Sequence, residues 1–351
     1  TARKVSSSLS SIVNSSMKIL HDSCANHTSI VGLLQCRLTK LLLTAKILWG
    51  FVIPTHQPTW SIKVPWIWIL ALTVLVFATA CSSGSNSKTL YIAGIPDQDI
   101  SVLEARFDKL ADYLGDKTGL DVQYLPSVDY AAVVVGFRQG DVQLAWYGGL
   151  TGVQARLAAP GAQALAQRVE DAAFHSVFVA QKDLDINSLE DLMGRSVTFG
   201  SESSTSGNLM PRSFLVEAGI NPDEDFSAVN YSGSHDKTWK LVESGSFDAG
   251  ALNSVVWHKR VADGSVNIGK VDAFYTSPPY FDYHWVVRGD LDANFGSGAT
   301  QKLRAALLEL DATHGGIEQD IMEAFDSGRF IPTTNSNYIA IEQVARNLGI
   351  I

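Results

Sequence analysis

The stretch GRSVTFGSESSTSGNLMPRSFLVEAG, residues 194–219, has the clearest local pattern in the chain. Residues 197–199 are β-branched or aromatic, as a short buried strand requires. Residues 201–207 follow with no aliphatic side chain, and apolar residues return at helical spacing from Leu209. Gly219 is a typical C-terminal stop for a helix. The stretch therefore predicts a strand, a hydroxyl-rich loop and a helix.

Three adjacent hydroxyls, those of Ser204, Thr205 and Ser206, surround the predicted helix N-terminus. A helix N-terminus presents unpaired backbone N–H groups and about half a positive charge. Together these groups form a pocket of donors without a formal charge, which suits a small tetrahedral oxyanion. The alternative is simple N-capping, for which one hydroxyl is enough.

Residues 188–211, SLEDLMGRSVTFGSESSTSGNLMP, closely resemble the phosphonate/phosphite/phosphate-type (PhnD-like) periplasmic binding proteins of ABC transporters. The resemblance covers residues 88–350, and the STSG element is fairly specific to that group. It implies the α/β fold of a type II periplasmic binding protein, with two α/β lobes and the ligand in the interlobe cleft. It also implies a cognate ABC permease as partner, no cofactor and no enzymatic activity.

Length and pattern agree with two lobes. A chain of 351 residues is too long for one small core. Strands alternate with helices, which predicts α/β sheets with ligand loops at the carboxyl ends of the strands. We expect lobe 1 to comprise residues 88–183 and 279–351, and lobe 2 to comprise residues 184–278. The segment from Tyr280 to Tyr283 is left without a role.

The net charge of −9 is unevenly distributed. Residues 1–80 hold seven of the 27 Lys and Arg residues and one of the 36 Asp and Glu residues. The remainder thus holds 20 basic and 35 acidic residues, a balance of −15. Such an acidic body is a poor nucleic-acid binder, so an anionic ligand must be held by local dipoles. We expect a monomer with no nucleic-acid partner.

Residues 63–81 predict export. Val64 to Ala80 is an uncharged apolar run that ends in small residues before Cys81, as in a lipoprotein signal. Ala78 stands where a bacterial lipobox usually has Leu, so a single uncleaved transmembrane anchor is the alternative. Both options place the body in the periplasm or cell envelope, with Cys81 as the lipidation site in the first. Residues 1–62 are an unassigned leader, which we attribute to an upstream start chosen in error or to genomic read-through.

Two tyrosines are candidate ligand contacts in the first lobe. Tyr147 follows a predicted strand and precedes Gly148 and Gly149, where a ligand can approach the backbone closely. Composition alone favours packing for a Tyr at a strand end. The family resemblance implies instead that Tyr147 faces the ligand, and Tyr130 is a similar but weaker candidate.

Three further candidates lie in the second lobe. His235 is part of a YxGxHD-like segment, and the resemblance implies that it contacts the ligand; the alternative is a cap or surface His. Asp248 precedes a predicted strand and could accept a hydrogen bond from a P–OH group. Asn253 ends that strand, on the side where ligands bind. Relatives often have Asp at this position, so the role of Asn253 is left open.

These features predict an extracytoplasmic solute-binding protein whose lobes close over a small anion. A receptor for another small anion and a signalling sensor domain are the alternatives. A serine hydrolase with Ser204, His235 and Asp236 is a third and remote alternative, because no GxSxG motif is present and the His and Asp are adjacent. The five His residues of the body show neither HExxH nor paired spacing, so no metal site is expected.

Ligand preference is predicted from the fourth substituent on phosphorus. The loop hydroxyls would bind oxygens that phosphate, phosphite and methylphosphonate share. An aromatic wall of Tyr147, Tyr130 and Trp146, bordered by His235 and Asp248, would face the remaining substituent. A phosphate hydroxyl pressed against such a wall would be desolvated without a partner. We therefore expect phosphite or methylphosphonate to bind more tightly than phosphate, with phosphite slightly ahead.

Overall fold

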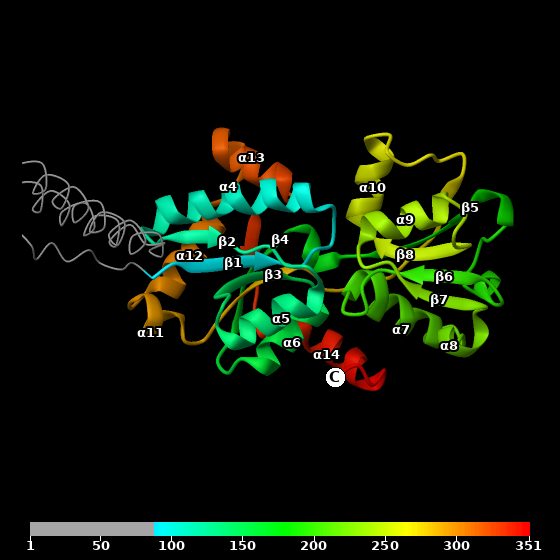
Figure 1. Ribbon diagram of the computed structural model, residues 1–351, viewed down its shortest axis with the longest axis horizontal. Coiled ribbons are helices and arrows are strands. Elements are labelled where there is room, and N and C mark those ends of the chain that lie inside the picture. Colours follow the sequence, from blue (N-terminus) through cyan, green and yellow to red (C-terminus); the bar gives the residue numbers. More distant parts are fainter. Residues whose placement is uncertain (1–87) are drawn as a thin grey trace, which may run out of the picture. The chain divides into compact units, whose positions relative to one another are not determined.

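The computed structural model describes residues 88–351, which lie within one compact unit (Figure 1). The leader at residues 1–62 and the signal at residues 63–81, with Cys81, fall outside the described residues. No helix within residues 88–351 is both long and apolar enough to cross a membrane.

The first sheet contains β1 (Leu90–Gly94), β2 (Val122–Tyr124), β3 (Leu144–Tyr147), β4 (Gln163–Arg168), β10 (His284–Val287) and β11 (Phe330–Pro332). The strand order is β11-β4-β10-β3-β1-β2. β1, β2 and β3 pair in parallel, whereas β10 runs antiparallel to β3 and β4, and β11 runs antiparallel to β4. The sheet is mixed because its last two strands come from the C-terminal part of the chain.

The second sheet contains β5 (Ser176–Gln181), β6 (Ser196–Phe199), β7 (Ala228–Tyr231), β8 (Ala249–Asn253) and β9 (Val271–Thr276). The strand order is β7-β6-β8-β5-β9. β6 pairs in parallel with β7 and β8, whereas β5 is antiparallel to β8 and β9. Each sheet with its covering helices forms one lobe, so the predicted two-lobed α/β architecture is confirmed.

Helices cover both sheets (Figure 1). The first lobe has α4 (Ile100–Thr118), α5 (Tyr130–Gln139), α6 (Gly149–Ala158), α11 (Leu291–Phe295), α12 (Ala299–Glu309), α13 (Gly316–Ala324) and α14 (Ile339–Asn347). The second lobe has α7 (Met210–Glu217), α8 (Pro222–Asp225), α9 (His235–Glu243) and α10 (Ser254–Ala262). Leu103, Phe107 and Leu114 of α4 are buried, and their spacing places them on one face of the helix.

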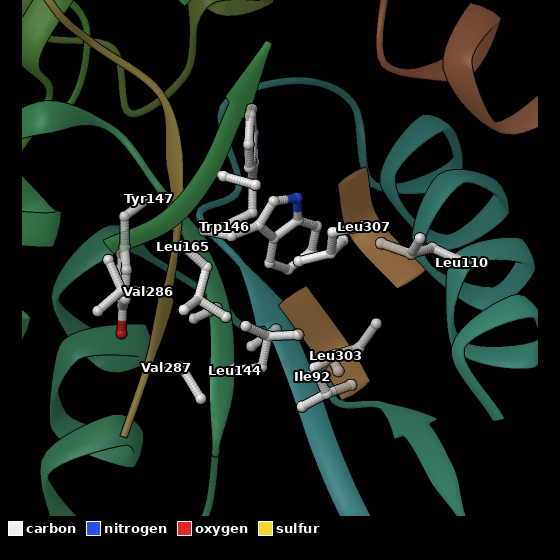
Figure 2. Close-up of a cluster of buried hydrophobic side chains, with 14 of the residues drawn as sticks. Ile92, Leu110, Leu144, Trp146, Tyr147, Leu165, Val286, Val287, Leu303 and Leu307 are labelled. Atoms are coloured by element: carbon white, nitrogen blue, oxygen red, sulfur yellow. The ribbon is translucent and has the colours of Figure 1, made fainter. Parts of the chain in front are cut away.

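The largest apolar core lies in the first lobe. Figure 2 shows Leu144 and Leu165 of the sheet gathered with Leu303 and Leu307 of α12. Helices α4 and α13 lie on one side of the sheet, and α5 and α6 lie on the other (Figure 1). Successive side chains of a strand point to opposite faces of the sheet. Because helices cover both faces of the central strands, the side chains on both faces are buried.

The chain passes between the lobes in two short segments. The first precedes Ser176, because β5 pairs only with strands of the second sheet. β5 therefore belongs to the second lobe, and the crossing lies before Ser176 and not at the expected boundary of residue 183. The second segment lies between Thr276 and His284, and it pairs with the first through reciprocal backbone hydrogen bonds of Phe174 and Tyr280 at 2.8 and 3.0 Å.

Candidate anion-binding site

The hydroxyl-rich loop lies at the carboxyl end of β6. It leads into a π-helical turn, η4 (Thr205–Leu209), which precedes α7. Ser204 is the N-cap, and its Oγ accepts a hydrogen bond from the N–H of Gly207 at 3.0 Å. N-capping thus accounts for Ser204. It does not account for Ser206, whose buried Oγ has no hydrogen-bond partner within the described residues.

Among the residues that the structure describes, three more buried polar atoms without a hydrogen-bond partner face the same region. They are Asp97 Oδ1, Tyr130 OH and Asp282 Oδ2. The proximity of these groups is reflected in the pKa of Tyr130. Burial raises this pKa well above its usual value, the charges of Asp97 and Asp282 raise it further, and the nearby hydroxyl of Ser204 opposes the rise. Buried polar atoms in folded proteins are almost always hydrogen-bonded. A cluster of them from both lobes therefore indicates a site for a polar ligand.

Thr205 connects the loop to the first lobe. Its Oγ1 accepts a hydrogen bond from the N–H of Leu150 at 2.9 Å, so its own proton is available for another acceptor. Asp282 Oδ1 accepts from the N–H of Gly149 at 2.8 Å. The N-terminal amides of α6 are therefore bonded to protein groups, and the expected direct approach of a ligand to Gly149 is not what the structure shows.

Asp282 is fully buried, and this burial raises the pKa of its carboxyl group to about 7. The hydrogen bond from Gly149 opposes the shift, as do the hydroxyls of Thr205 and Ser206, and the charge of Asp171 adds to it. A carboxyl group of this pKa exists in both forms near neutral pH. It can accept a hydrogen bond from P–OH when ionised, or donate one to P–O⁻ when protonated.

His235, Asn253 and Tyr283 form a second polar group beside the loop. His235 Nδ1 accepts from the N–H of Asn253 at 3.3 Å, and burial lowers the pKa of His235. The imidazole is therefore neutral with its proton on Nε2, which lies 3.1 Å from the Tyr283 oxygen. Asn253 Nδ2 also donates to that oxygen, at 3.1 Å. With two donors on its oxygen, Tyr283 has its own proton free to donate.

Tyr147 does not face this site, contrary to the prediction. Its hydroxyl donates to the carbonyl of Val133 at 3.1 Å, and its ring packs edge-on against Phe137. Figure 2 shows Tyr147 directed away from Trp146, in keeping with strand alternation. Trp146 is also a core residue, stacked on Tyr283 with ring centroids 5.7 Å apart. Packing, the alternative for Tyr147, is what the structure contains.

Asp248 is also placed away from the site. Its Oδ2 accepts from the N–H and the Oγ of Ser196, at 2.8 and 2.9 Å. It precedes β8, whereas Asn253 ends this strand, which puts the two residues about 17 Å apart at 3.3 Å per residue. The carboxylate that faces the loop is therefore that of Asp282, and the role expected for Asp248 is wrong.

The geometry also excludes a Ser204–His235–Asp236 relay. Asp236 accepts two hydrogen bonds from Arg260, at 2.7 and 3.0 Å. His235 Nδ1 is occupied by Asn253, so no carboxylate orients the imidazole. Within residues 88–351, no cluster of His, Cys, Asp and Glu is arranged to hold a metal ion.

Comparisons with known proteins bear on this site. The family model described as "ABC transporter, phosphonate, periplasmic substrate-binding protein" matches residues 92–338. A Prochlorococcus marinus (strain MIT 9301) protein, described as "Probable ABC transporter phosphite binding protein PhnD1", is 42% identical over 274 residues, 76% of this chain and 92% of that protein. A Mycolicibacterium smegmatis protein, described as "Phosphate-import protein PhnD", is 30% identical over 59% of this chain and 71% of its own length.

Two solved structures of phosphonate-type binding proteins are also similar to this chain. That of PhnD1 from Prochlorococcus marinus in complex with methylphosphonate is 42% identical, with a TM-score of 0.73 over 76% of this chain and all of that chain. A binding protein component of an ABC phosphonate transporter from Pseudomonas aeruginosa has a TM-score of 0.66 over 74% of this chain and 86% of its own. At 21% identity, the second structure supports the fold alone.

Proposed function

Since this chain belongs to the family of periplasmic substrate-binding proteins of ABC phosphonate transporters, we propose that it delivers a small phosphorus oxyanion, phosphite or methylphosphonate in preference to phosphate. The observation that carries this proposal is the cluster of buried polar atoms beside Ser204, Thr205 and Ser206 that have no hydrogen-bond partner within residues 88–351. The lobes hold the anion between them, and membership in this family places the protein outside the cytoplasm. A serine hydrolase is not supported.

The donors and acceptors suit an anion with one P–OH group. Thr205, Ser206 and Tyr283 each supply a hydroxyl proton, and these donors carry no formal charge. Asp282 Oδ2 supplies one acceptor that shares a proton with the ligand near neutral pH. Uncharged donors favour a weakly charged head over a larger phosphate ester, which Arg usually binds with two hydrogen bonds.

The preference over phosphate depends on the fourth substituent. Tyr147 and Trp146 lie in the core, so the aromatic surface of this site comes from Tyr130 and Tyr283. Hydrogen or methyl needs no hydrogen-bond partner against an aromatic ring, whereas a hydroxyl does. The names of the Prochlorococcus marinus relative and of the ligand in its structure support the same choice.

Phosphate is the second candidate. Asp97 Oδ1 and Asp282 Oδ2 are both unpartnered, and two such acceptors could serve the two P–OH groups of a phosphate monoanion. The Mycolicibacterium smegmatis relative is described as a phosphate-import protein. Binding of the two anions must therefore be compared directly.

Anchoring and assembly complete the proposal. A lipid on Cys81 tethers the body to the cell envelope, and the uncleaved apolar run before it is the alternative. The protein acts as a monomer and passes its ligand to a cognate ABC permease.

A thermal-shift screen tests the ligand class. Phosphite, methylphosphonate and phosphate, with sulfate and acetate as other small anions, are added to wild-type protein and to Asp248→Asn. A ligand that binds only the folded state raises the melting temperature. We expect phosphorus oxyanions to raise it in both proteins, because Asp248 lies away from the site. A rise with sulfate or acetate and none with the phosphorus oxyanions would contradict the proposal.

A further inference from the structure

The carbonyl of Ser206 has no backbone partner in the turn that carries the site. In η4, the N–H of Met210 is bonded to the carbonyl of Thr205. The next residue along the chain is Pro211, which has no N–H. A carbonyl this deep in the protein is costly when unpaired. The loop therefore needs a donor from elsewhere to hold the Ser206 peptide in place.

That donor is Ser176, the first residue of β5. Its Oγ lies 2.8 Å from the Ser206 carbonyl oxygen and 2.6 Å from the hydroxyl of Tyr280. A carbonyl can only accept, so the Ser176 proton points to Ser206. The Tyr280 hydroxyl must then donate to Ser176 Oγ. The three groups are therefore linked by two hydrogen bonds: Tyr280 donates to Ser176, and Ser176 donates to the carbonyl of Ser206.

Both hydroxyls come from the segments where the chain passes between the lobes. Ser176 follows the first segment and is fully buried, and Tyr280 lies within the second. The segments are held together by the backbone pair of Phe174 and Tyr280, and by the Ser277 hydroxyl, which accepts from the N–H of Ser176 at 2.9 Å. The segments between the lobes are thus connected to the anion-binding loop through the side chains of Ser176 and Tyr280.

We propose that Ser176 and Tyr280 are positioning residues that hold the Ser206 peptide so that its hydroxyl faces the bound anion. This inference rests on the proposed function, because it concerns the same site. Neither residue touches the ligand in this account. Each acts through the carbonyl of Ser206. This carbonyl needs a side-chain donor because Pro211 has no N–H.

The test measures the affinity for phosphite by calorimetry in Ser176→Ala, Tyr280→Phe and Ser206→Ala, alone and combined. Ser176→Ala should weaken binding about tenfold, because the buried carbonyl loses its donor. Tyr280→Phe keeps the shape of the ring and should weaken binding about threefold. Tyr275→Phe, on β9, is the control and should leave the affinity unchanged, since Tyr275 packs on Phe178 away from the loop.

The deciding readout is a double-mutant cycle. A residue that acts through Ser206 should matter less once the Ser206 hydroxyl is gone, so Ser176→Ala should cost under about threefold in the Ser206→Ala background. An equal loss in both backgrounds, or wild-type affinity in Tyr280→Phe, would overturn the positioning role while the proposed function stands. Failure of wild-type protein to bind phosphite, methylphosphonate or phosphate would overturn both. Melting temperatures of all variants show whether the fold is retained.

Discussion

Asp282 has a carboxyl group whose pKa is raised strongly by burial. Its pKa is about 7 in the folded state against 3.8 for the ordinary group, so folding takes up a proton between these values. Its contribution to stability is therefore present below about pH 4 and is lost as pH rises through 7. His235 and His284, whose pKa values are lowered by burial, act in the opposite direction as pH falls below 6.5.

Comparison of wild type with Asp282→Asn separates these effects. The melting temperature of the variant relative to wild type should rise as pH goes from 5 to 8, because the variant has no carboxylate to ionise. Asp248→Asn, which removes a carboxylate outside the site, is the control, and its melting temperature should show no such trend relative to wild type. Thermal unfolding of the three ligand-free proteins across this pH range provides the measurement. A constant difference between Asp282→Asn and wild type would contradict the assignment.

The loop hydroxyls give a second prediction. Thr205→Ala and Ser206→Ala should each weaken ligand binding by about 1–3 kcal/mol, the cost of leaving a charged acceptor short of a donor. Ser244→Ala removes an exposed hydroxyl that is bonded locally to Leu241, and it should have no effect. Calorimetric titration of phosphite is the measurement. Unchanged affinity in both loop variants would rule out this site.

At this scale the sequence predicted one part of the candidate site. Ser204, Thr205 and Ser206 were chosen because they are consecutive and precede a helix, and their contact with a ligand stays a prediction. Asp282 and Tyr283 were missed, since their partners lie far away in the sequence and only folding brings them together. Tyr147 was assigned wrongly because both faces of β3 are covered, so its place at the strand end did not imply exposure.

At the scale of elements, the turn η4 depends on Gly207. A Cβ at this position would lie 3.0 Å from Ser204 Oγ and 3.1 Å from both Gly200 Cα and His235 Cε1. The Gly200 backbone cannot move aside easily, so Gly207→Ala should displace the turn and weaken phosphite binding at least tenfold. Gly115→Ala, in α4, meets nothing closer than 3.4 Å and should bind normally. Wild-type affinity in Gly207→Ala, measured by calorimetry, would show that the turn is not constrained in this way.

The pattern of the sequence predicted the strand and the helix that flank the hydroxyl-rich loop. β6 lies where residues 197–199 predicted a strand, and α7 lies where the apolar spacing from Leu209 predicted a helix. β4 (sequence QALAQR) was not predicted, because it contains none of the β-branched and aromatic residues that are enriched in strands. Its pairing between β10 and β11 overrides that preference. The first crossing was misplaced because β5 reads as an ordinary buried strand, and nothing local shows to which sheet it belongs.

At the scale of the whole molecule, the site exists only where the lobes meet. His235 donates its N–H to the carbonyl of Asp97 at 2.9 Å, and Thr205 accepts from Leu150 at 2.9 Å. Lys259 and Asp326 form an ion pair across the same boundary at 2.5 Å. No local sequence pattern specifies such contacts, so the prediction that the ligand lies between the lobes came from the family resemblance and not from periodicity.

Anchoring is tested on the full chain in its native envelope. Cys81→Ser should release the body from the membrane fraction if a lipid on this residue is the anchor. Cys36→Ser, a change in the leader, is the control and should leave the distribution unchanged. Immunoblots of membrane and soluble fractions provide the measurement. Retention of Cys81→Ser in the membrane, with the apolar run intact, would indicate a transmembrane anchor instead.

The central claim is that this site binds a small phosphorus oxyanion and rejects a hydroxyl at the fourth position. Competitive titration of wild-type protein with phosphite, methylphosphonate and phosphate at one fixed pH tests it most directly. We expect phosphite and methylphosphonate to bind about ten- to a hundredfold more tightly than phosphate, the cost of one unpaired buried hydroxyl. Phosphate binding as tightly as the other two anions would contradict the account.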